Sequence, residues 1–321
     1  MSSIRSIREG LGNLQHKLDY TDYAFEAGDS LNFEERNFGY FIPRKSQQKF
    51  TAFHKYDLDV AEYVAWILAG SINNLCSCNG LLVAVVKVRK MVVLLDPVQQ
   101  KNVSKFSTSS RPARLASLNR NRIAVTLPDE GIIQMLCISD LEVLKKTSDI
   151  KVEQGCWDIA YNKTQDCLYV SYLEPKSKVT VLKETGEILR VLDKDILGNS
   201  LFISPGNIAF SFDEWSLYVS DTGRNMVIKT SLNGKVETVY KDKDLKYPRG
   251  IAVDENGSVF ACGETSNNIH QLSPDLSKIG ITIESKDMHS PLTVAICNTG
   301  ASKCLFVGMS SNTKVKVFSL T

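Results

Sequence analysis

Eight residues along the chain are of the types that proteins use to hold a partner. They are Arg111, Arg114, Trp157, Asn207, Arg224, Asn225, Arg249 and Asn268. Arginine and tryptophan side chains stack on the bases of single-stranded RNA, and asparagine hydrogen-bonds to base edges. Arginine and tryptophan are also among the residue types that contribute most to protein–protein contacts. These residues therefore fit a protein partner or a single-stranded RNA, provided that the fold brings them together.

A repeated pattern supplies the elements that would position these residues. In "RGIAVDENGSVFACGETSNNIHQLSPDLSKI", residues 249–279, three apolar runs are separated by polar turns. The same environment recurs at intervals of roughly 40–50 residues, the length of a four-stranded sheet with tight connections. Its anchor positions are Leu75, Leu115, Ile159, Ile208, Ile251 and Val294. Since the runs are β-branched and aromatic and are bounded by Gly, Pro, Asn and Asp, the chain is predicted to be all-β, a six-bladed β-propeller with four-stranded antiparallel blades.

The propeller is predicted to span residues 49–321 and to be closed by a strand from its N-terminal side. The sixth repeat ends with "TKVKVFSLT", which supplies only a third strand. We expect the outer strand of this blade to come from residues 50–68, so that both ends of the domain share one blade and no long edge stays unpaired. A long β-sandwich is the alternative fold, but it would not require six equal units.

Residues 1–24 carry a different pattern. Apolar residues follow the 3, 4 spacing of a heptad seam. These residues are Ile4, Ile7, Leu11, Leu14 and Leu18. The spacing predicts a short amphipathic helix, either the end of a coiled coil that would allow a homodimer or a helix packed on the propeller. Residues 25–48 are predicted to be an irregular linker.

Propeller geometry gathers the candidate binding residues on one face. The loop that leads into the first strand of a blade and the loop between its second and third strands open on the same side, where binding is expected. Arg111, Arg114, Trp157, Asn207 and Arg249 fall in or next to the leading loops, and Arg224, Asn225 and Asn268 fall in or next to the second-to-third loops. Two structural roles stay open at this stage: the asparagines could brace turns, and Trp157 could fill space between blades.

Catalysis and metal binding have weaker support in the sequence. Some six-bladed propellers are calcium-dependent lactonases, which hold the metal on the axis with carboxylate and amide oxygens. Here only Asp158, Asn207 and Asn73 could serve, whereas Arg111 and Arg249 would repel a cation. The chain has 4 histidines, none of which falls in a predicted leading loop, and no C-x-x-C pair for zinc among its 8 cysteines. We therefore predict no catalytic residue, no metal and no cofactor.

Composition favours a protein without a membrane segment or a global preference for nucleic acid. The net charge is +2, from 38 basic and 36 acidic residues. No stretch is typical of a signal peptide, and the apolar runs are too short to span a bilayer. The cysteines lie mostly within apolar runs, as expected in a reducing compartment. A cytoplasmic location is predicted.

Two of the repeats are similar to a known family. "YPRGIAVDENGSVFACGETSNNIHQLS" and "SPGNIAFSFDEWSLYVSDTGRNMVIKTSLNGKV" resemble NHL repeats, and with the N-terminal heptad they resemble the C-terminal half of a tripartite-motif NHL protein. The resemblance implies a module that recognises partners or substrates for ubiquitination, and it implies that RNA binding is open to the chain. The sequence has no RING or B-box cysteine and histidine pattern, so ubiquitin-ligase catalysis does not carry over.

The predicted function is therefore a non-catalytic interaction module. It would recruit a protein partner through one face of the propeller. The alternative is single-stranded RNA binding by the same face, and a further alternative is a calcium-dependent lactonase-like enzyme.

Overall fold

The computed structural model describes residues 23–25, 41–43, 49–59, 72–78, 80–119, 121–195, 197–284, 288–299, 302–310 and 314–321. The chain divides into two compact units, Met1–Gln48 and Lys49–Thr321. The described residues of the first unit form an antiparallel strand pair, β1 (Tyr23–Phe25) and β2 (Phe41–Pro43). All other described strands belong to the second unit.

The predicted N-terminal helix is wrong. None of the described residues lies in a helix, and Tyr23 and Ala24, at the end of the predicted 1–24 helix, lie in β1. Tyr23 is paired with Pro43, within the segment predicted to be an irregular linker. Aromatic residues such as Phe25 and Phe41 favour strands, and this local preference was overlooked. The heptad positions that suggested a coiled coil and a homodimer lie outside the described residues.

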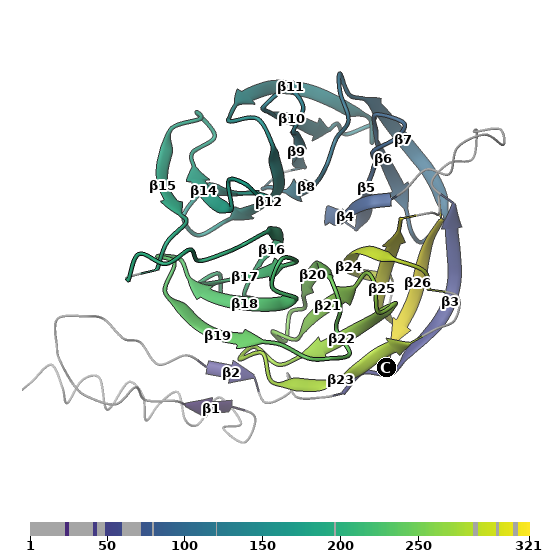
Figure 1. Ribbon diagram of the computed structural model, residues 1–321. Helices are drawn as coiled ribbons and strands as arrows, with labels where there is room; N and C mark the ends of the chain where they lie inside the picture. The colour runs from purple at the N-terminus through teal and green to yellow at the C-terminus, as the bar shows by residue number, and fades with distance from the viewer. Residues whose placement is uncertain are drawn as a thin grey trace, which may run out of the picture. The chain divides into compact units, whose positions relative to one another are not determined.

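Six four-stranded antiparallel sheets make up the second unit, as predicted (Figure 1). Blade 1 consists of β4 (Ile72–Cys78), β5 (Leu81–Val86), β6 (Met91–Asp96) and β7 (Lys101–Ser107). Blade 2 consists of β8 (Leu115–Ser117), β9 (Arg122–Leu127), β10 (Ile132–Ile138) and β11 (Leu144–Lys151). Blade 3 consists of β12 (Cys156–Asn162), β13 (Cys167–Tyr172), β14 (Lys178–Leu182) and β15 (Ile188–Leu192).

The remaining blades repeat this order. Blade 4 consists of β16 (Pro205–Phe210), β17 (Ser216–Asp221), β18 (Met226–Ser231) and β19 (Val236–Tyr240). Blade 5 consists of β20 (Pro248–Val253), β21 (Val259–Gly263), β22 (Asn268–Leu272) and β23 (Lys278–Glu284). Blade 6 consists of β24 (Pro291–Thr299), β25 (Ser302–Met309), β26 (Lys314–Leu320) and β3 (Ala52–Asp59). The first strand of each blade lies toward the centre of the ring and the fourth lies at its rim (Figure 1).

Blade 6 is built from both ends of the propeller domain. The outer strand β3 pairs with β26, from Lys314 opposite Asp59 to Leu320 opposite Ala52. Thr51 and Thr321 extend the pairing with two backbone hydrogen bonds of 3.1 and 3.2 Å. The outer strand that the sixth repeat lacks thus comes from within the 50–68 segment, and it closes the ring.

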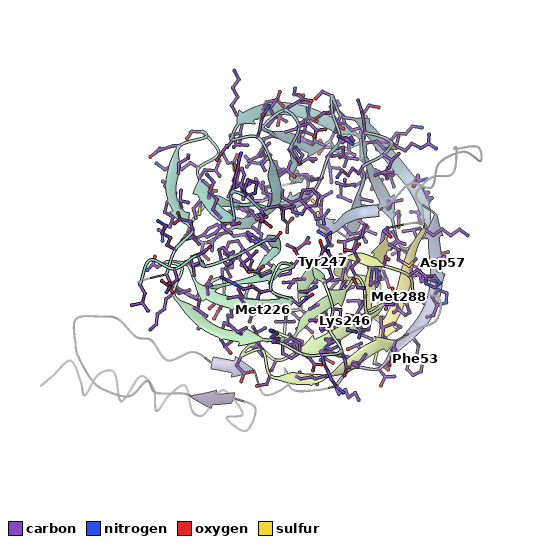
Figure 2. All side chains as sticks on the ribbon, in the orientation of Figure 1. Phe53, Asp57, Met226, Lys246, Tyr247 and Met288 are labelled. Carbon is purple, nitrogen blue, oxygen red and sulfur yellow. The ribbon has the colours of Figure 1, made fainter. Side chains whose placement is uncertain are left out.

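Packing between blades provides the core. All six residues of β13 are buried, because both faces of this middle strand are covered. Tyr169 of this strand packs with Leu217 and Val219 of the neighbouring blade. The outer strands meet water, and Ile188 of β15 is 64% exposed. Side chains fill the space between the strands throughout the ring (Figure 2). None of the described residues belongs to a helix long and apolar enough to cross a membrane.

Candidate partner-binding face

Three of the predicted site residues come together beside the propeller axis. Arg114 immediately precedes β8, and its guanidinium carbon lies 5.1 Å from the centre of the Trp157 ring. Its Nη2 donates a long hydrogen bond of 3.5 Å to Oδ1 of Asn207. First strands of three successive blades therefore meet at this point, as expected of residues placed around an axis.

The Arg114 guanidinium is buried and only partly hydrogen-bonded. The residue is 1% exposed. Nη1 donates to the carbonyl of Ala113 at 3.0 Å, whereas Nε is buried without a hydrogen-bond partner among the described residues. Burial lowers the pKa of Arg114 to about 10, and the nearby Asp158 carboxylate opposes this shift. Such a buried cation carries a desolvation cost that its protein contacts offset only in part.

Asp158 is the carboxylate that raises the pKa of Arg114 most strongly. It is 3% exposed, and its Oδ2 accepts a hydrogen bond of 2.7 Å from the backbone N–H of Ile208. Burial raises the pKa of Asp158 to about 6, while the Arg114 cation, the Ile208 N–H and Asn207 act in the opposite direction. Asp158 thus links blades 3 and 4 and also balances part of the Arg114 charge.

Lys87 is a residue that the sequence analysis missed. It follows the end of β5, and its Nζ lies 5.0 Å from the centre of the Trp157 ring. Burial lowers the pKa of Lys87, and the Arg114 and Arg111 cations lower it further. The indole Nε1 of Trp157 is buried without a hydrogen-bond partner in the described part of the chain. Two cations, Lys87 and Arg114, therefore lie against the Trp157 ring, while the indole N–H makes no hydrogen bond within the described part of the chain.

Arg111 and Arg249 complete the cation cluster, and each has an acidic partner. Nε of Arg111 lies 3.2 Å from Oδ2 of Asp129, in an exposed ion pair. Nε of Arg249 lies 2.7 Å from Oε2 of Glu264, and its guanidinium carbon lies 4.8 Å from the centre of the Tyr247 ring. The Arg249 cation lowers the pKa of both Arg114 and Lys87, which places it within electrostatic range of both. We call Lys87, Arg111, Arg114, Trp157 and Arg249 the cationic face.

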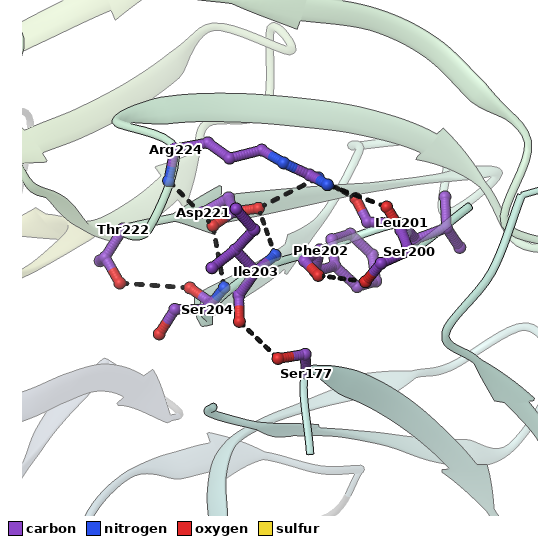
Figure 3. A network of polar contacts seen from close by, with 9 residues as sticks. All are labelled: Ser177, Ser200, Leu201, Phe202, Ile203, Ser204, Asp221, Thr222 and Arg224. Atoms are coloured by element: carbon purple, nitrogen blue, oxygen red, sulfur yellow. Dashed lines mark hydrogen bonds and ion pairs between the residues drawn. The ribbon is translucent and has the colours of Figure 1, made fainter. Parts of the chain in front are cut away.

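Arg224, another predicted site residue, is engaged inside the fold. Its Nη1 donates to the carbonyl of Leu201 and its Nη2 donates to the carbonyl of Ser200 (Figure 3). Asp221, which is fully buried, accepts hydrogen bonds from the backbone N–H groups of Ile203 at 2.9 Å and of Ser204 at 3.0 Å. Together they fasten the loop between β15 and β16.

Asn225 and Asn268 also make internal hydrogen bonds. Oδ1 of Asn225 accepts from the backbone N–H of Tyr247 at 2.7 Å. Nδ2 of Asn268 donates to the carbonyl of Asp244 at 2.7 Å and contacts Nε2 of His270 at 3.2 Å. These contacts are the turn-bracing role that the sequence analysis left open for both asparagines.

The oxygens considered for calcium have other contacts. Asp158 accepts from a backbone N–H and Asn207 accepts from Arg114, as described above, and the side chain of Asn73 lies outside the described residues. No group of three or more His, Cys, Asp or Glu side chains that could hold a metal ion occurs in the described ranges. The Asp158 and Asn207 side-chain oxygens are thus already used in hydrogen bonds within the fold.

Comparisons with known proteins identify the class of fold. A β-propeller repeat family, SBBP, matches residues 241–270, which contain β20, β21 and the start of β22 in blade 5. Virginiamycin B lyase from Staphylococcus aureus is similar in structure, with a TM-score of 0.59 and 10% sequence identity, over 85% of this chain and 100% of that chain. A streptogramin B lyase gives a TM-score of 0.57 at 11% identity, over 85% of this chain and 98% of that chain. The chain is a six-bladed β-propeller.

A third similar structure is an enzyme of another kind. Kuenenia stuttgartiensis hydrazine synthase matches with a TM-score of 0.54 and 15% identity, over 76% of this chain and 75% of that chain. No curated protein matches the chain significantly by sequence. At such identities the similarity extends to the fold and not to individual residues, so the function must be argued from the site itself.

Proposed function

We propose that the protein is a non-catalytic interaction module that recruits a protein partner through the cationic face. One observation supports this proposal most strongly. The Arg114 guanidinium is buried against the Trp157 ring, and its Nε has no hydrogen-bond partner among the described residues. Arginine and tryptophan in desolvated surroundings are the residues that dominate binding energy in protein interfaces. A partner that hydrogen-bonds to these groups would recover part of the cost of burying them.

The resemblance to NHL repeats supports the same role. In the tripartite-motif family such repeats form the half of the protein that recognises partners. Recognition of a ubiquitination substrate is therefore one form that the recruitment would take.

Charge balance favours a protein over single-stranded RNA. Arg111 and Arg249 are paired with Asp129 and Glu264, and Asp158 lies near Arg114. A polyphosphate chain binds best to a track of uncompensated cations, because its affinity comes largely from counterion release. The interspersed carboxylates would repel such a chain, whereas a protein segment can place one charged group among neutral ones.

Affinity capture with matched charge-reversal variants tests the proposal. The double variant Lys87→Glu with Arg111→Glu reverses two cations of the cationic face. The control, Lys146→Glu with Lys183→Glu, makes the same change in net charge at two exposed lysines near outer strands. Each immobilised protein is incubated with ribonuclease-treated lysate, and the retained proteins are quantified by mass spectrometry.

We expect proteins that are retained by the wild type and the control to be lost by the face variant. Identical retained sets for all three would contradict recruitment through this face. Submicromolar, salt-sensitive binding of a random single-stranded RNA pool, abolished in the face variant, would favour the RNA alternative instead.

A further inference from the structure

Three donors around the Trp157 ring have no acceptor. They are Nε of Arg114, Nε1 of Trp157 and Nζ of Lys87, which has no hydrogen bond or ion pair within the described parts of the chain. Nearly all buried polar groups in native proteins find a partner, so two buried donors left open at one place call for an explanation. Because all three groups are N–H donors and two carry positive charge, the ligand that would satisfy them is an anionic acceptor.

The hydrogen bonds that Arg114 already makes indicate the shape of that acceptor. Nη1 is used by the Ala113 carbonyl, and Nη2 is held only weakly by Asn207, at 3.5 Å. The edge of the guanidinium formed by Nε and Nη2 therefore keeps its hydrogen-bonding capacity. Two parallel N–H groups along one edge match the two oxygens of a carboxylate in a single plane.

The charge count at the cationic face limits the ligand to a small negative charge. Four cations, Lys87, Arg111, Arg114 and Arg249, are accompanied by three carboxylates, those of Asp129, Asp158 and Glu264. The excess is a single positive charge. One carboxylate balances it, whereas a phosphate or a phosphodiester chain would bring further negative charge close to the acidic side chains.

Lys87 is the more accessible of the two cations at the Trp157 ring. Arg114 is almost completely buried, while Lys87 is partly exposed and lies on the turn after β5. The long, flexible lysine side chain contacts Trp157 through a cation–π interaction, which is weak at a partly exposed site. An incoming carboxylate would therefore meet the Lys87 ammonium first, and could draw it from the ring on the way to the guanidinium edge.

We propose that the cationic face binds an acidic peptide segment of its protein partner, with one glutamate or aspartate carboxylate on the Nε–Nη2 edge of Arg114 and within reach of Trp157 Nε1 and Lys87. This inference rests on the proposed function and specifies the chemistry of the partner.

Fluorescence anisotropy with defined peptides tests this chemistry. The probe is a fluorescein-labelled glycine–serine peptide that carries a single glutamate, and the matched control peptide carries glutamine at that position. We expect the glutamate peptide to bind at least about tenfold more tightly, since a hydrogen bond to a charged group is worth a factor of this order or more. The affinity should fall as sodium chloride is raised, because the attraction is screened. Equal affinity for the two peptides would overturn the inference.

Three variants locate the peptide. Trp157→Phe keeps an aromatic ring and removes the indole donor, and Arg114→Lys keeps the charge and removes the planar edge. We expect Trp157→Phe to lower the affinity about fivefold and Arg114→Lys to lower it at least about tenfold. The control, Lys183→Gln, changes an exposed lysine near an outer strand and should bind like the wild type. If Arg114→Lys does not fold, Trp157→Phe decides alone: affinity equal to that of Lys183→Gln would overturn the inference.

Two further probes separate other anions. A phosphoserine–glycine peptide and a random single-stranded RNA pool are measured under the same conditions. Tighter binding of either one than of the glutamate peptide would overturn the assignment to a carboxylate. If lysate proteins are lost by the Lys87→Glu and Arg111→Glu variant but the glutamate peptide does not bind, the inference fails and the recruiting function stands. If no lysate protein depends on the face, the recruiting function fails.

Discussion

Two sides of the same propeller face use similar residues in different ways. On the side of blades 4 and 5, Arg224, Asn225 and Asn268 make hydrogen bonds within the fold. On the side of blades 1 to 3, Arg114 and Trp157 keep buried donors without partners among the described residues. The residue types are similar on the two sides, so the difference must come from the loops that these residues occupy and from the acceptors that neighbouring segments offer.

The connection between β15 and β16 explains much of this difference. It spans residues 193–204 and brings the carbonyls of Ser200 and Leu201 to the Arg224 guanidinium (Figure 3). The shorter connection that precedes β8 gives Arg114 only the carbonyl of Ala113. An arginine on this face is therefore structural where a long connection supplies acceptors, and it remains able to bind a ligand where none does.

The largest effect is expected from Asp221→Ala, on the internally bonded side. The substitution removes the acceptor of the Ile203 and Ser204 N–H groups and leaves Arg224 without its carboxylate. We expect the free energy of unfolding to fall by about 3–5 kcal/mol, because one partner of a buried polar network is lost. Urea denaturation measures this change. The exposed Asp149, which pairs with Lys146, is the control, and Asp149→Ala should cost less than about 1 kcal/mol.

The second-largest effect is a pH dependence of stability that arises from Asp158, on the side of blades 1 to 3. The folded-state pKa of Asp158 is raised from 3.8 to about 6 by burial. The folded protein therefore holds this proton more tightly than the unfolded chain, and its contribution to stability is lost as the pH rises through about 6. The contribution amounts to at most about 3 kcal/mol.

Asp158→Asn removes this titration and keeps an acceptor for the Ile208 N–H. We expect the unfolding free energy of the wild type, relative to the variant, to fall between pH 4 and pH 7, as measured by urea denaturation at each pH. Parallel pH profiles would show that Asp158 titrates normally, and that Arg114 and the hydrogen bonds to Asp158 fully offset the cost of burying its charge.

A smaller effect is expected at Asn225. Asn225→Ala should lower the unfolding free energy by about 1–2 kcal/mol, because the Tyr247 N–H loses its acceptor and alanine adopts a positive φ poorly. The φ of Asn225 is +53°. Asn225→Gly tolerates this φ and should recover part of the loss. Thermal denaturation of the two variants separates the hydrogen bond from the backbone conformation, and equal stability of both would mean that φ contributes nothing.

The smallest effect on stability is expected from Trp157→Phe. Its Nε1 has no partner among the described residues, so removal of the donor breaks no hydrogen bond. We expect a change of less than about 1 kcal/mol in the free energy of unfolding, measured by urea denaturation. A loss as large as that of Asp221→Ala would mean that Trp157 is a core residue, and the contrast between the two sides would disappear.

Sequence reasoning predicted the blades better than it predicted the site. Apolar runs and polar turns are local signals, and the six-bladed propeller they indicated is confirmed. The helix over 1–24 was wrong where the structure describes it, since a heptad over few turns is weak against aromatic residues such as Tyr23 that favour a strand.

The site depends on contacts between distant loops, which one repeat cannot reveal. Lys87 was not among the predicted residues, because only the fold places it against Trp157, on a different blade. In the same way, the sequence shows that Arg114 and Arg224 lie in loops of the predicted binding face. It does not show that Arg224, unlike Arg114, donates hydrogen bonds to the carbonyls of Ser200 and Leu201. A search for acidic residues on adjacent leading loops would have brought Asp158 and Arg114 together.

The closure of blade 6 also means that β3 must wait for its partner strand during translation. Strand β3 leaves the ribosome with five blades still to be translated before its partner β26, residues 314–320, exists. At about 5–20 residues per second, the delay is on the order of 10–50 s. During this time β3 offers an unpaired edge to other nascent chains, and its charged residues Lys55 and Asp57 would discourage such pairing. The strand that completes the ring is thus the one that must stay unattached longest.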